Sequence, residues 1–224
     1  MQKPELKKEN IQEVADKKFV HLYDIGYGEG QHYYSVSRRN ANGILAPKTD
    51  AERHQALPDA VSCFLILRTP GSAPRLLMFR EFRYPTGQFV LGIPSGLIDE
   101  RDYDCADPIK ASMIREIQEE TGITVKDTDH IFTLNHLLYC SPGLTDECTA
   151  AVCAVIDLED LSSLNTSGAE GTEVFNGFLL YTREEVLDIL AKGEDTDGGY
   201  YPMVTYAAML YFISDLWKAE IAER

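Results

Sequence analysis

The sequence is poor in positive charge. Lys and Arg together number 21 against 36 Asp and Glu, which gives the 224-residue chain a formal net charge of −15. A protein that follows phosphates along a nucleic acid needs a cationic surface, and an anionic lipid surface would repel this chain. We therefore expect neither a nucleic acid nor a membrane as partner. An anionic substrate would need a local Arg cluster or a bound divalent cation to attract it.

The sequence also lacks a long uninterrupted apolar run. The longest, Tyr201 to Trp217, contains Thr205 and Asp215. It falls short of the roughly 20 residues that span a bilayer, so it predicts a core helix. The charged stretch from Met1 to Phe19 has no apolar segment of the secretory kind, and we expect no signal peptide.

Cysteine is scarce and follows no metal or redox spacing. The cysteines number 5 and form no C-x-x-C pair, which argues against a disulfide framework. Most of them lie within apolar runs. We therefore expect reduced, buried thiols and a cytoplasmic protein, the residues being Cys63, Cys105, Cys140, Cys148 and Cys153.

The N-terminal quarter predicts a small β module. Hydrophobic residues make up 44% of the chain, which argues against intrinsic disorder. Residues 3–17 predict a short surface helix, and residues 19–24 and 31–38 predict two strands around a Gly-rich turn. Residues 40–59 are rich in Asn, Gly, Pro, Lys and Asp, which is typical of a linker.

The main sheet is expected after this linker. We place a module boundary at residue 57, so that the β module covers residues 1–57 and the main domain covers residues 58–224. Short stretches rich in Val, Ile, Leu and Phe predict the strands of this domain. They lie at residues 61–68, 75–80, 88–93, 131–139, 148–156 and 174–181.

Helix-capping residues predict the helices. Asp107 followed by a Pro opens a helix that Gly122 ends, and the capping box from Thr182 to Glu185 opens another. A last helix is expected over Met203–Ala222. The chain holds more strand than a doubly wound fold would, so we predict the α+β class or a helix–sheet–helix sandwich.

Carboxylates lie on the core-facing stripe of the helix that Asp107 opens. At about 100° per residue, Glu116 and Glu120 fall within about 40° of each other, close to the direction of Ile109 and Met113. Negative charge is also unfavourable at a helix C-terminus. A solvated acidic face is therefore disfavoured, and a hard divalent cation such as Mg²⁺ suits a site made of oxygen ligands.

The segment Arg115-Glu116-Ile117-Gln118-Glu119-Glu120-Thr121-Gly122-Ile123 resembles the signature of Nudix hydrolases. That signature has Arg-Glu, an aliphatic residue, any residue, Glu-Glu, any residue, Gly and an aliphatic residue, and the segment matches every defined position. The resemblance implies an enzyme of the α+β class. Its fold would be the Nudix α/β/α sandwich with a mixed β-sheet, preceded by the small β module.

The resemblance also implies roles for individual residues. Arg115 would orient the helix carboxylates by ion pairing and take part in catalysis, and Gly96 would let its loop close over the metals. Mg²⁺ would be the cofactor, with Mn²⁺ as a substitute. The implied metal ligands are the side chains of Glu116, Glu119 and Glu120 together with the backbone carbonyl of Ser95.

The N-terminal half of the signature departs from the family pattern. The gap between Gly96 and Arg115 is five residues longer than the pattern has. Counting back from Arg115 places Asp107 where the family has its first Glu, whereas counting forward from Gly96 places Asp102 there. We assign the surplus, residues 103–107, to a longer loop before the helix.

The flanks of the signature resemble ADP-ribose pyrophosphatases and related nucleoside diphosphate sugar hydrolases. The matching blocks are Arg80 to Pro85, Ile93 to Asp99 and Ser141 to Glu147, and the likeness covers roughly residues 60–190. A Pro downstream of the signature, here Pro142, is typical of the ADP-ribose group.

The stretch Tyr33 to Arg38 resembles the family segment that holds the adenine and the phosphates. Tyr33 would stack on the base or, alternatively, pack within its sheet. Arg38 and Arg83 would contact the phosphates. The implied substrate-binding residues are thus Tyr33, Arg38, Arg83, Gly96 and Pro142.

A general base is also implied by the subfamily. It is often a Glu in the loop before a late strand, and the matching loop here is residues 168–174. Glu173 is the first choice and Glu170 the second. Glu120, already at the metals, is the competing base.

The sequence thus predicts a Mg²⁺-dependent hydrolase that cleaves the pyrophosphate of ADP-ribose or a related nucleoside diphosphate sugar into AMP (NMP) and a sugar phosphate. One alternative is hydrolysis of a dinucleoside polyphosphate or a dinucleotide cofactor. Another is a non-catalytic Nudix-like sensor that binds nucleotide sugars. In relatives the N-terminal unit swaps onto a partner subunit, so the resemblance implies a homodimer.

Overall fold

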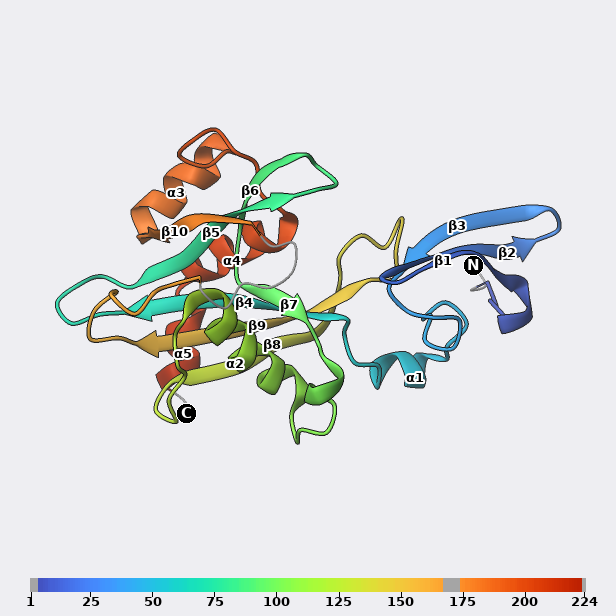
Figure 1. Cartoon of the computed structure of the whole chain (residues 1–224), viewed down its shortest axis with the longest axis horizontal. Coiled ribbons are helices and arrows are strands. Elements are labelled where there is room, and N and C mark those ends of the chain that lie inside the picture. Colours follow the sequence, from blue (N-terminus) through green and yellow to red (C-terminus); the bar gives the residue numbers. More distant parts are fainter. Residues whose placement is uncertain (1–3, 167–173, 223–224) are drawn as a thin grey trace. The chain divides into compact units, whose positions relative to one another are not determined.

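The computed structural model describes residues 4–166 and 174–222 and is drawn in Figure 1. The chain divides into two compact units. One is formed by Met1–Asp59 with Leu137–Thr149, and the other by Ala60–His136 with Ala150–Arg224. The segment Leu137–Thr149 was not assigned to the N-terminal unit from the sequence. The division into domains over residues 1–57 and 58–224 stays a prediction.

The smaller unit contains an antiparallel sheet in the order β1-β2-β3, made of β1 (Ile11–Lys17), β2 (Val20–Gly28) and β3 (Gln31–Ser37). A 3-10 turn, η1 (Lys8–Asn10), precedes β1. The helix predicted over residues 3–17 is therefore wrong. Backbone pairing of β1 with β2 outweighs the helix propensity of this stretch, because an isolated helix this short is marginal in water.

The linker packs onto this sheet and closes a small core. Tyr23 and Ile25 of β2 are buried together with Ile44 from the linker. The linker also contains α1 (Asp50–His54), which begins with a capping box between Thr49 and Glu52.

The sheet of the larger unit contains seven strands among the described residues, with the path β10-β5-β4-β9-β8. β6 pairs with β5, and β7 pairs with β4. The six predicted strands are confirmed, whereas the short β7 was not predicted. The strands are β4 (Ala60–Arg68), β5 (Arg75–Arg83), β6 (Gln88–Gly92), β7 (Ser95–Leu97), β8 (His130–Tyr139), β9 (Cys148–Asp157) and β10 (Phe175–Tyr181).

Helices cover both faces of this sheet, as Figure 1 shows. Alternate residues of a strand point to opposite faces. On β4, Phe64 and Ile66 pack with residues of α3 (Arg183–Lys192) and α4 (Met203–Ser214). Cys63, Leu65 and Leu67 pack with residues of α2 (Pro108–Thr121) on the other face. The predicted α+β class and the helix–sheet–helix sandwich are confirmed.

The ends of α2 are those that the sequence predicts. The side chain of Asp107 accepts a hydrogen bond from the backbone of Lys110, and Pro108 is the first helical residue. Gly122 follows the helix with a φ of 74°, a left-handed conformation that favours glycine. The Arg-Glu and Glu-Glu pairs thus occupy the last turns of a helix packed on the sheet.

The single helix predicted over Met203–Ala222 is wrong. Asp215 has a φ of 60°, which separates α4 from α5 (Leu216–Ala222). Trp217 is buried, and its indole nitrogen donates to the carbonyl of Phe212 at 3.1 Å. Burial of this indole offsets the backbone cost at Asp215. Over residues 4–166 and 174–222, no helix is long and apolar enough to cross a membrane.

The cysteines lie within the described residues and are free thiols. Cys63, Cys148 and Cys153 are buried, as predicted. The expectation of burial is wrong for Cys105 and Cys140, which are exposed. Cys105 lies in the loop before α2 and Cys140 directly follows β8, so neither side chain enters a core.

Candidate active site

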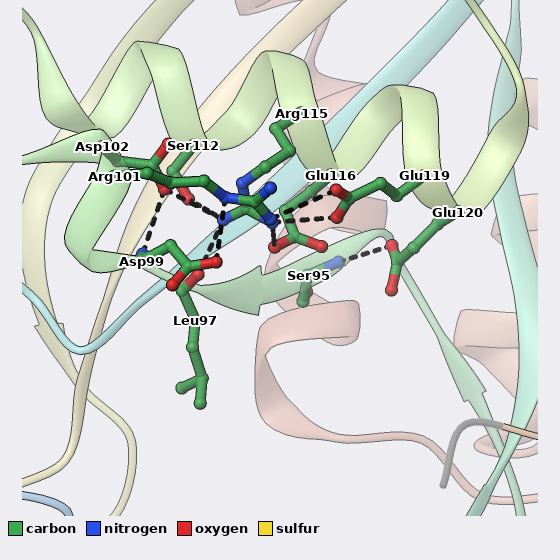
Figure 2. Close-up of polar contacts among 10 residues, drawn as sticks. All are labelled: Ser95, Leu97, Asp99, Arg101, Asp102, Ser112, Arg115, Glu116, Glu119 and Glu120. Carbon is green, nitrogen blue, oxygen red and sulfur yellow. Dashed lines mark hydrogen bonds and ion pairs between the residues drawn. The ribbon is translucent and has the colours of Figure 1, made fainter. Parts of the chain in front are cut away.

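Acidic side chains gather at the C-terminal end of α2, as Figure 2 shows. Glu116 and Glu120 are 6% and 3% exposed, which places them among the buried residues of the helix with Met113 and Ile117. The side chain of Glu119 is 28% exposed. Buried carboxylates at this end of a helix cost free energy unless positive charge or hydrogen bonds compensate them.

Arg115 supplies part of that compensation. Its Nη1 donates to Glu116 Oε1 at 2.6 Å and to Glu119 Oε2 at 2.9 Å. Its Nη2 donates to the carbonyl of Leu97 and to Asp102 Oδ2, each at 3.0 Å. Burial lowers the pKa of Arg115, but these hydrogen bonds and charges outweigh burial, so the pKa is raised and the guanidinium stays charged. Arg115 therefore cross-links the helix to the segment that follows β7.

Gly96 brings β7 against Glu116. A Cβ at this position would lie 1.9 Å from Cδ of Glu116 and 2.0 Å and 2.2 Å from its two carboxylate oxygens. No side chain larger than hydrogen fits unless the carboxylate moves. The neighbouring Ser95 donates its backbone N–H to Glu120 Oε2 at 3.0 Å. β7 thus positions two of the three carboxylates.

We predict that Gly96→Ala leaves the protein folded but lowers activity. The added methyl must displace the carboxylate of Glu116 and strain its ion pair with Arg115, but it leaves the apolar packing of α2 in place, so the cost in stability is small. A misplacement of about 1 Å within an active site can lower a rate by about 100-fold. Turnover and thermal unfolding measured on the same preparation check this, and unchanged turnover would contradict the role of Gly96.

Asp102 rather than Asp107 pairs with the signature Arg. Asp102 ends the 3-10 turn η2 (Glu100–Asp102), is 5% exposed, and accepts from Arg115 and from the backbone of Asp99, each at 3.0 Å. Burial raises the pKa of Asp102, but these hydrogen bonds outweigh it and hold the pKa below its usual range. Asp107 caps α2 instead. The geometry thus favours the count forward from Gly96.

These contacts predict different results for the two aspartates. Asp102→Asn should lower activity by about 10- to 100-fold, because it loosens Arg115, which the resemblance implies to be the residue that orients the metal ligands. Asp107→Asn should change little, because Asn caps a helix about as well as Asp. Steady-state kinetics of the two variants checks this, and equal effects would contradict the assignment.

Comparison with known proteins decides the family. A family model of the NUDIX domain matches residues 56–203 of the chain. The chain belongs to the Nudix family. A protein of Schizosaccharomyces pombe named as a Nudix hydrolase is 33% identical over 147 residues, which cover 63% of this chain and 66% of that protein.

Other relatives carry names that refer to ADP-ribose or ADP-sugars. The ADP-ribose pyrophosphatase of Saccharomyces cerevisiae is 25% identical over 156 residues, 66% of this chain and 58% of that protein. The ADP-sugar pyrophosphatase of Mus musculus is 23% identical over 129 residues, 58% of this chain and 55% of that protein. The chain thus spans between 55% and 66% of the length of these relatives.

A solved structure shares the fold of this Nudix protein. The crystal structure of an ADP compounds hydrolase matches with a TM-score of 0.54 and 18% sequence identity. The match covers 97% of this chain and 95% of that chain. At this level of identity the likeness establishes the Nudix fold and nothing about the substrate.

Three of the residues that the resemblance assigns to the substrate, Tyr33, Arg38 and Pro142, lie in the smaller unit of this Nudix protein. Tyr33 is 46% exposed, and its hydroxyl donates to the carbonyl of Gly143 at 2.5 Å. Arg38 pairs with Glu147. Both partners lie in the loop that contains Pro142, so β3 and this loop come together although about 110 residues separate them. No local pattern in the sequence indicates this pairing.

Of the other predicted residues, Arg83 lies within the described part of the chain, whereas the predicted bases do not. Arg83 lies at the end of β5, where its Nη2 is 2.7 Å from Glu81 Oε2, and its side chain is 48% exposed. Glu173 and Glu170, the predicted bases, lie outside the described residues. Their roles, like those of the other site residues, stay predictions.

The α2 site suits a hard divalent cation. Its donors are carboxylate oxygens, and the missing side chain at Gly96 lets the carboxylate of Glu116 lie against β7. A different group, Glu13, Asp16 and His21 of the β1–β2 hairpin, places its ligand atoms within 4.8 Å of one another. There His21 Nδ1 lies 2.6 Å from Glu13 Oε1, so a hydrogen bond between these side chains accounts for their closeness.

Proposed function

We propose that this Nudix protein hydrolyses the pyrophosphate bond of ADP-ribose or a related nucleoside diphosphate sugar in a Mg²⁺-dependent reaction. The observation that carries the proposal is the convergence of Glu116, Glu119 and Glu120 at the end of α2, against the glycine of β7. The relatives named as ADP-ribose and ADP-sugar pyrophosphatases support the substrate class.

In this proposal, water attacks one phosphorus of the diphosphate. Its oxygen forms a new P–O bond, the bond from that phosphorus to the bridging oxygen breaks, and the products are AMP (NMP) and a sugar phosphate. A carboxylate accepts a proton from the attacking water, and the candidates are Glu120 and Glu173. Glu120 is a carboxylate 3% exposed with an oxygen held by the N–H of Ser95, which fixes its position.

The chain's own residues would hold Mg²⁺, or Mn²⁺ in its place. The ligands would be Glu116, Glu119, Glu120 and the carbonyl of Ser95. When bound, such ions neutralise phosphate charge and lower the pKa of coordinated water. Arg115 keeps two of the carboxylates at fixed positions on one guanidinium nitrogen. The positive charge of the bound ions would attract an anionic substrate to a chain of net charge −15.

The remaining parts of the proposal concern substrate and assembly. Tyr33 would stack on the base, Arg38 and Arg83 would bind phosphate oxygens, and Pro142 would shape the loop beside Tyr33. We propose a small β module over residues 1–57, a Nudix domain over residues 58–224, a homodimer and a cytoplasmic location. Size-exclusion chromatography with light scattering tests the dimer.

A substrate panel tests the function. It contains ADP-ribose, ADP-glucose, UDP-glucose, a diadenosine polyphosphate and NADH, each with Mg²⁺ and with excess EDTA, and products are separated by chromatography. We expect AMP and ribose 5-phosphate from ADP-ribose, lost with EDTA. Preference for another compound would change the assigned substrate. Tight binding of ADP-ribose without any turnover would contradict the proposed hydrolysis and favour a sensor.

A further inference from the structure

A second arginine, Arg101, reaches the carboxylates from η2. Its Nη2 lies 3.4 Å from Glu119 Oε1, and its Nε lies 3.0 Å from Asp99 Oδ2. The three side chains are drawn in Figure 2. It occupies a position of the Nudix signature at which any residue is allowed. Its closeness to Glu119 follows from the turn of η2, which Asp102 fixes through Arg115.

Glu119 therefore has a guanidinium at each oxygen. Arg115 holds Oε2 at 2.9 Å, and Arg101 approaches Oε1 at 3.4 Å. The two arginines differ in solvent exposure and in the number of acceptors that they bind. The side chain of Arg115 is 16% exposed and donates to several other acceptors, whereas that of Arg101 is 58% exposed.

A cation that binds Glu119 has to compete with these guanidinium groups. Arg101 is the group that can leave, because its contact with Glu119 is longer and its side chain is more exposed. Exposed ion pairs contribute little free energy, so release of Arg101 costs little. Once released, a guanidinium beside the carboxylates can bind an anion, and phosphate oxygens match its donor geometry.

We propose that Arg101 exchanges partners during the reaction cycle. Without metal it is a counter-ion of Glu119, and with metal and substrate bound it is a ligand of the substrate's diphosphate. The inference rests on the proposed function and adds a phosphate-binding residue at a position that the signature leaves undefined. It also predicts that metal affinity and substrate affinity change in opposite directions when Arg101 is replaced.

Arg101→Gln tests the exchange. Without substrate, Mn²⁺ measured by calorimetry or electron paramagnetic resonance should bind about two- to fivefold more tightly, since the competing ion pair is lost. With saturating Mg²⁺, KM for ADP-ribose should rise about tenfold with kcat nearly unchanged, because the lost contact serves ground and transition states alike. A non-hydrolysable α,β-methylene analogue should lose affinity to the same extent.

Two further variants sharpen the test. Arg101→Lys keeps the charge but not the two-pronged geometry, so Mn²⁺ affinity should stay near that of the wild type while KM still rises. Lys110→Gln removes one positive charge from α2, nine residues or about 13 Å of helix before Glu119. At physiological salt it should change neither quantity, because that distance exceeds the screening length.

The outcomes separate this inference from the proposed function. Weaker binding of both Mn²⁺ and the analogue in Arg101→Gln would mean that Arg101 merely supports the site, and it would overturn the exchange. Unchanged values would also overturn it. If the wild type turned over no member of the substrate panel, the proposed function would fail, whereas the Mn²⁺ and analogue titrations would still decide the role of Arg101.

Discussion

Replacing Glu120 by Gln should lower turnover of ADP-ribose by about three orders of magnitude or more. Metal-ion catalysis stabilises a transition state by several kcal/mol, and each 1.36 kcal/mol is about tenfold in rate. Gln has nearly the same shape, and its amide oxygen can still accept the N–H of Ser95, which lies 3.0 Å from Glu120 Oε2. The change thus removes the charge of a carboxylate that is 3% exposed and preserves its packing.

The same variant should keep or slightly raise stability. Loss of one negative charge at the C-terminal end of α2 removes an unfavourable interaction with the helix dipole, worth about 0.3–1 kcal/mol at most sites. Glu119→Gln should behave alike in turnover. Glu184→Gln, an exposed acid in the first turn of α3, is the matched control and should retain activity.

AMP release and urea unfolding of these variants decide the assignment. Near-normal turnover by a folded Glu120→Gln protein would show that this carboxylate neither holds a metal nor accepts the proton. If Glu120→Gln lost both its activity and its fold, this variant alone would not test the role of Glu120 in the reaction. For that reason Glu119, whose side chain is 28% exposed, is tested in parallel.

The end of α2 could be predicted because its signals are local. A cap at Asp107, a glycine at position 122 and a stripe at helical spacing all lie within 16 residues of sequence. The same spacing placed Glu116 and Glu120 on the buried face, where the structure has them. Helix caps and periodicity are properties of neighbouring residues, so a single sequence contains them.

Contacts between distant segments could not be predicted in this way. The pairing of Tyr33 with Gly143 joins residues 110 positions apart, and no local pattern marks either partner. A helix was predicted where β1 lies, because the composition of this stretch contains no information about its pairing with β2. Asp102 was one of two candidates from spacing alone, and only the turn of η2 distinguishes it.

Asp195→Ala should lower the free energy of unfolding by about 3 kcal/mol. Asp195 follows α3, is 3% exposed, and its Oδ2 lies 2.7 Å from Nε of Arg80 on β5. Removing one partner leaves a charge that is 12% exposed with less compensation, and broken buried pairs typically cost about 3–5 kcal/mol. Because Arg80 also pairs with Asp197, we expect the lower end of that range.

The backbone of the loop adds to this effect. Oδ1 of Asp195 accepts hydrogen bonds from the backbone N–H groups of Asp197 and Gly199, each at 2.8 Å. The alanine variant loses these acceptors as well as the ion pair. Asp195→Asn keeps a side-chain oxygen for the N–H groups, so it isolates the charge and should cost less than Asp195→Ala.

The pH dependence of the difference provides an independent check. Burial raises the pKa of Asp195, but the hydrogen bonds from Arg80 and the loop backbone outweigh it, so the folded-state pKa lies below the usual value. The carboxylate therefore stabilises the fold above its unfolded pKa of about 3.9, and this contribution is lost as pH falls through the lower folded value. Urea unfolding of the wild type and Asp195→Asn should thus give a constant difference between about pH 5 and 7 that shrinks below about pH 4. A difference that grew on acidification would mean that the pair with Arg80 does not stabilise the ionised form.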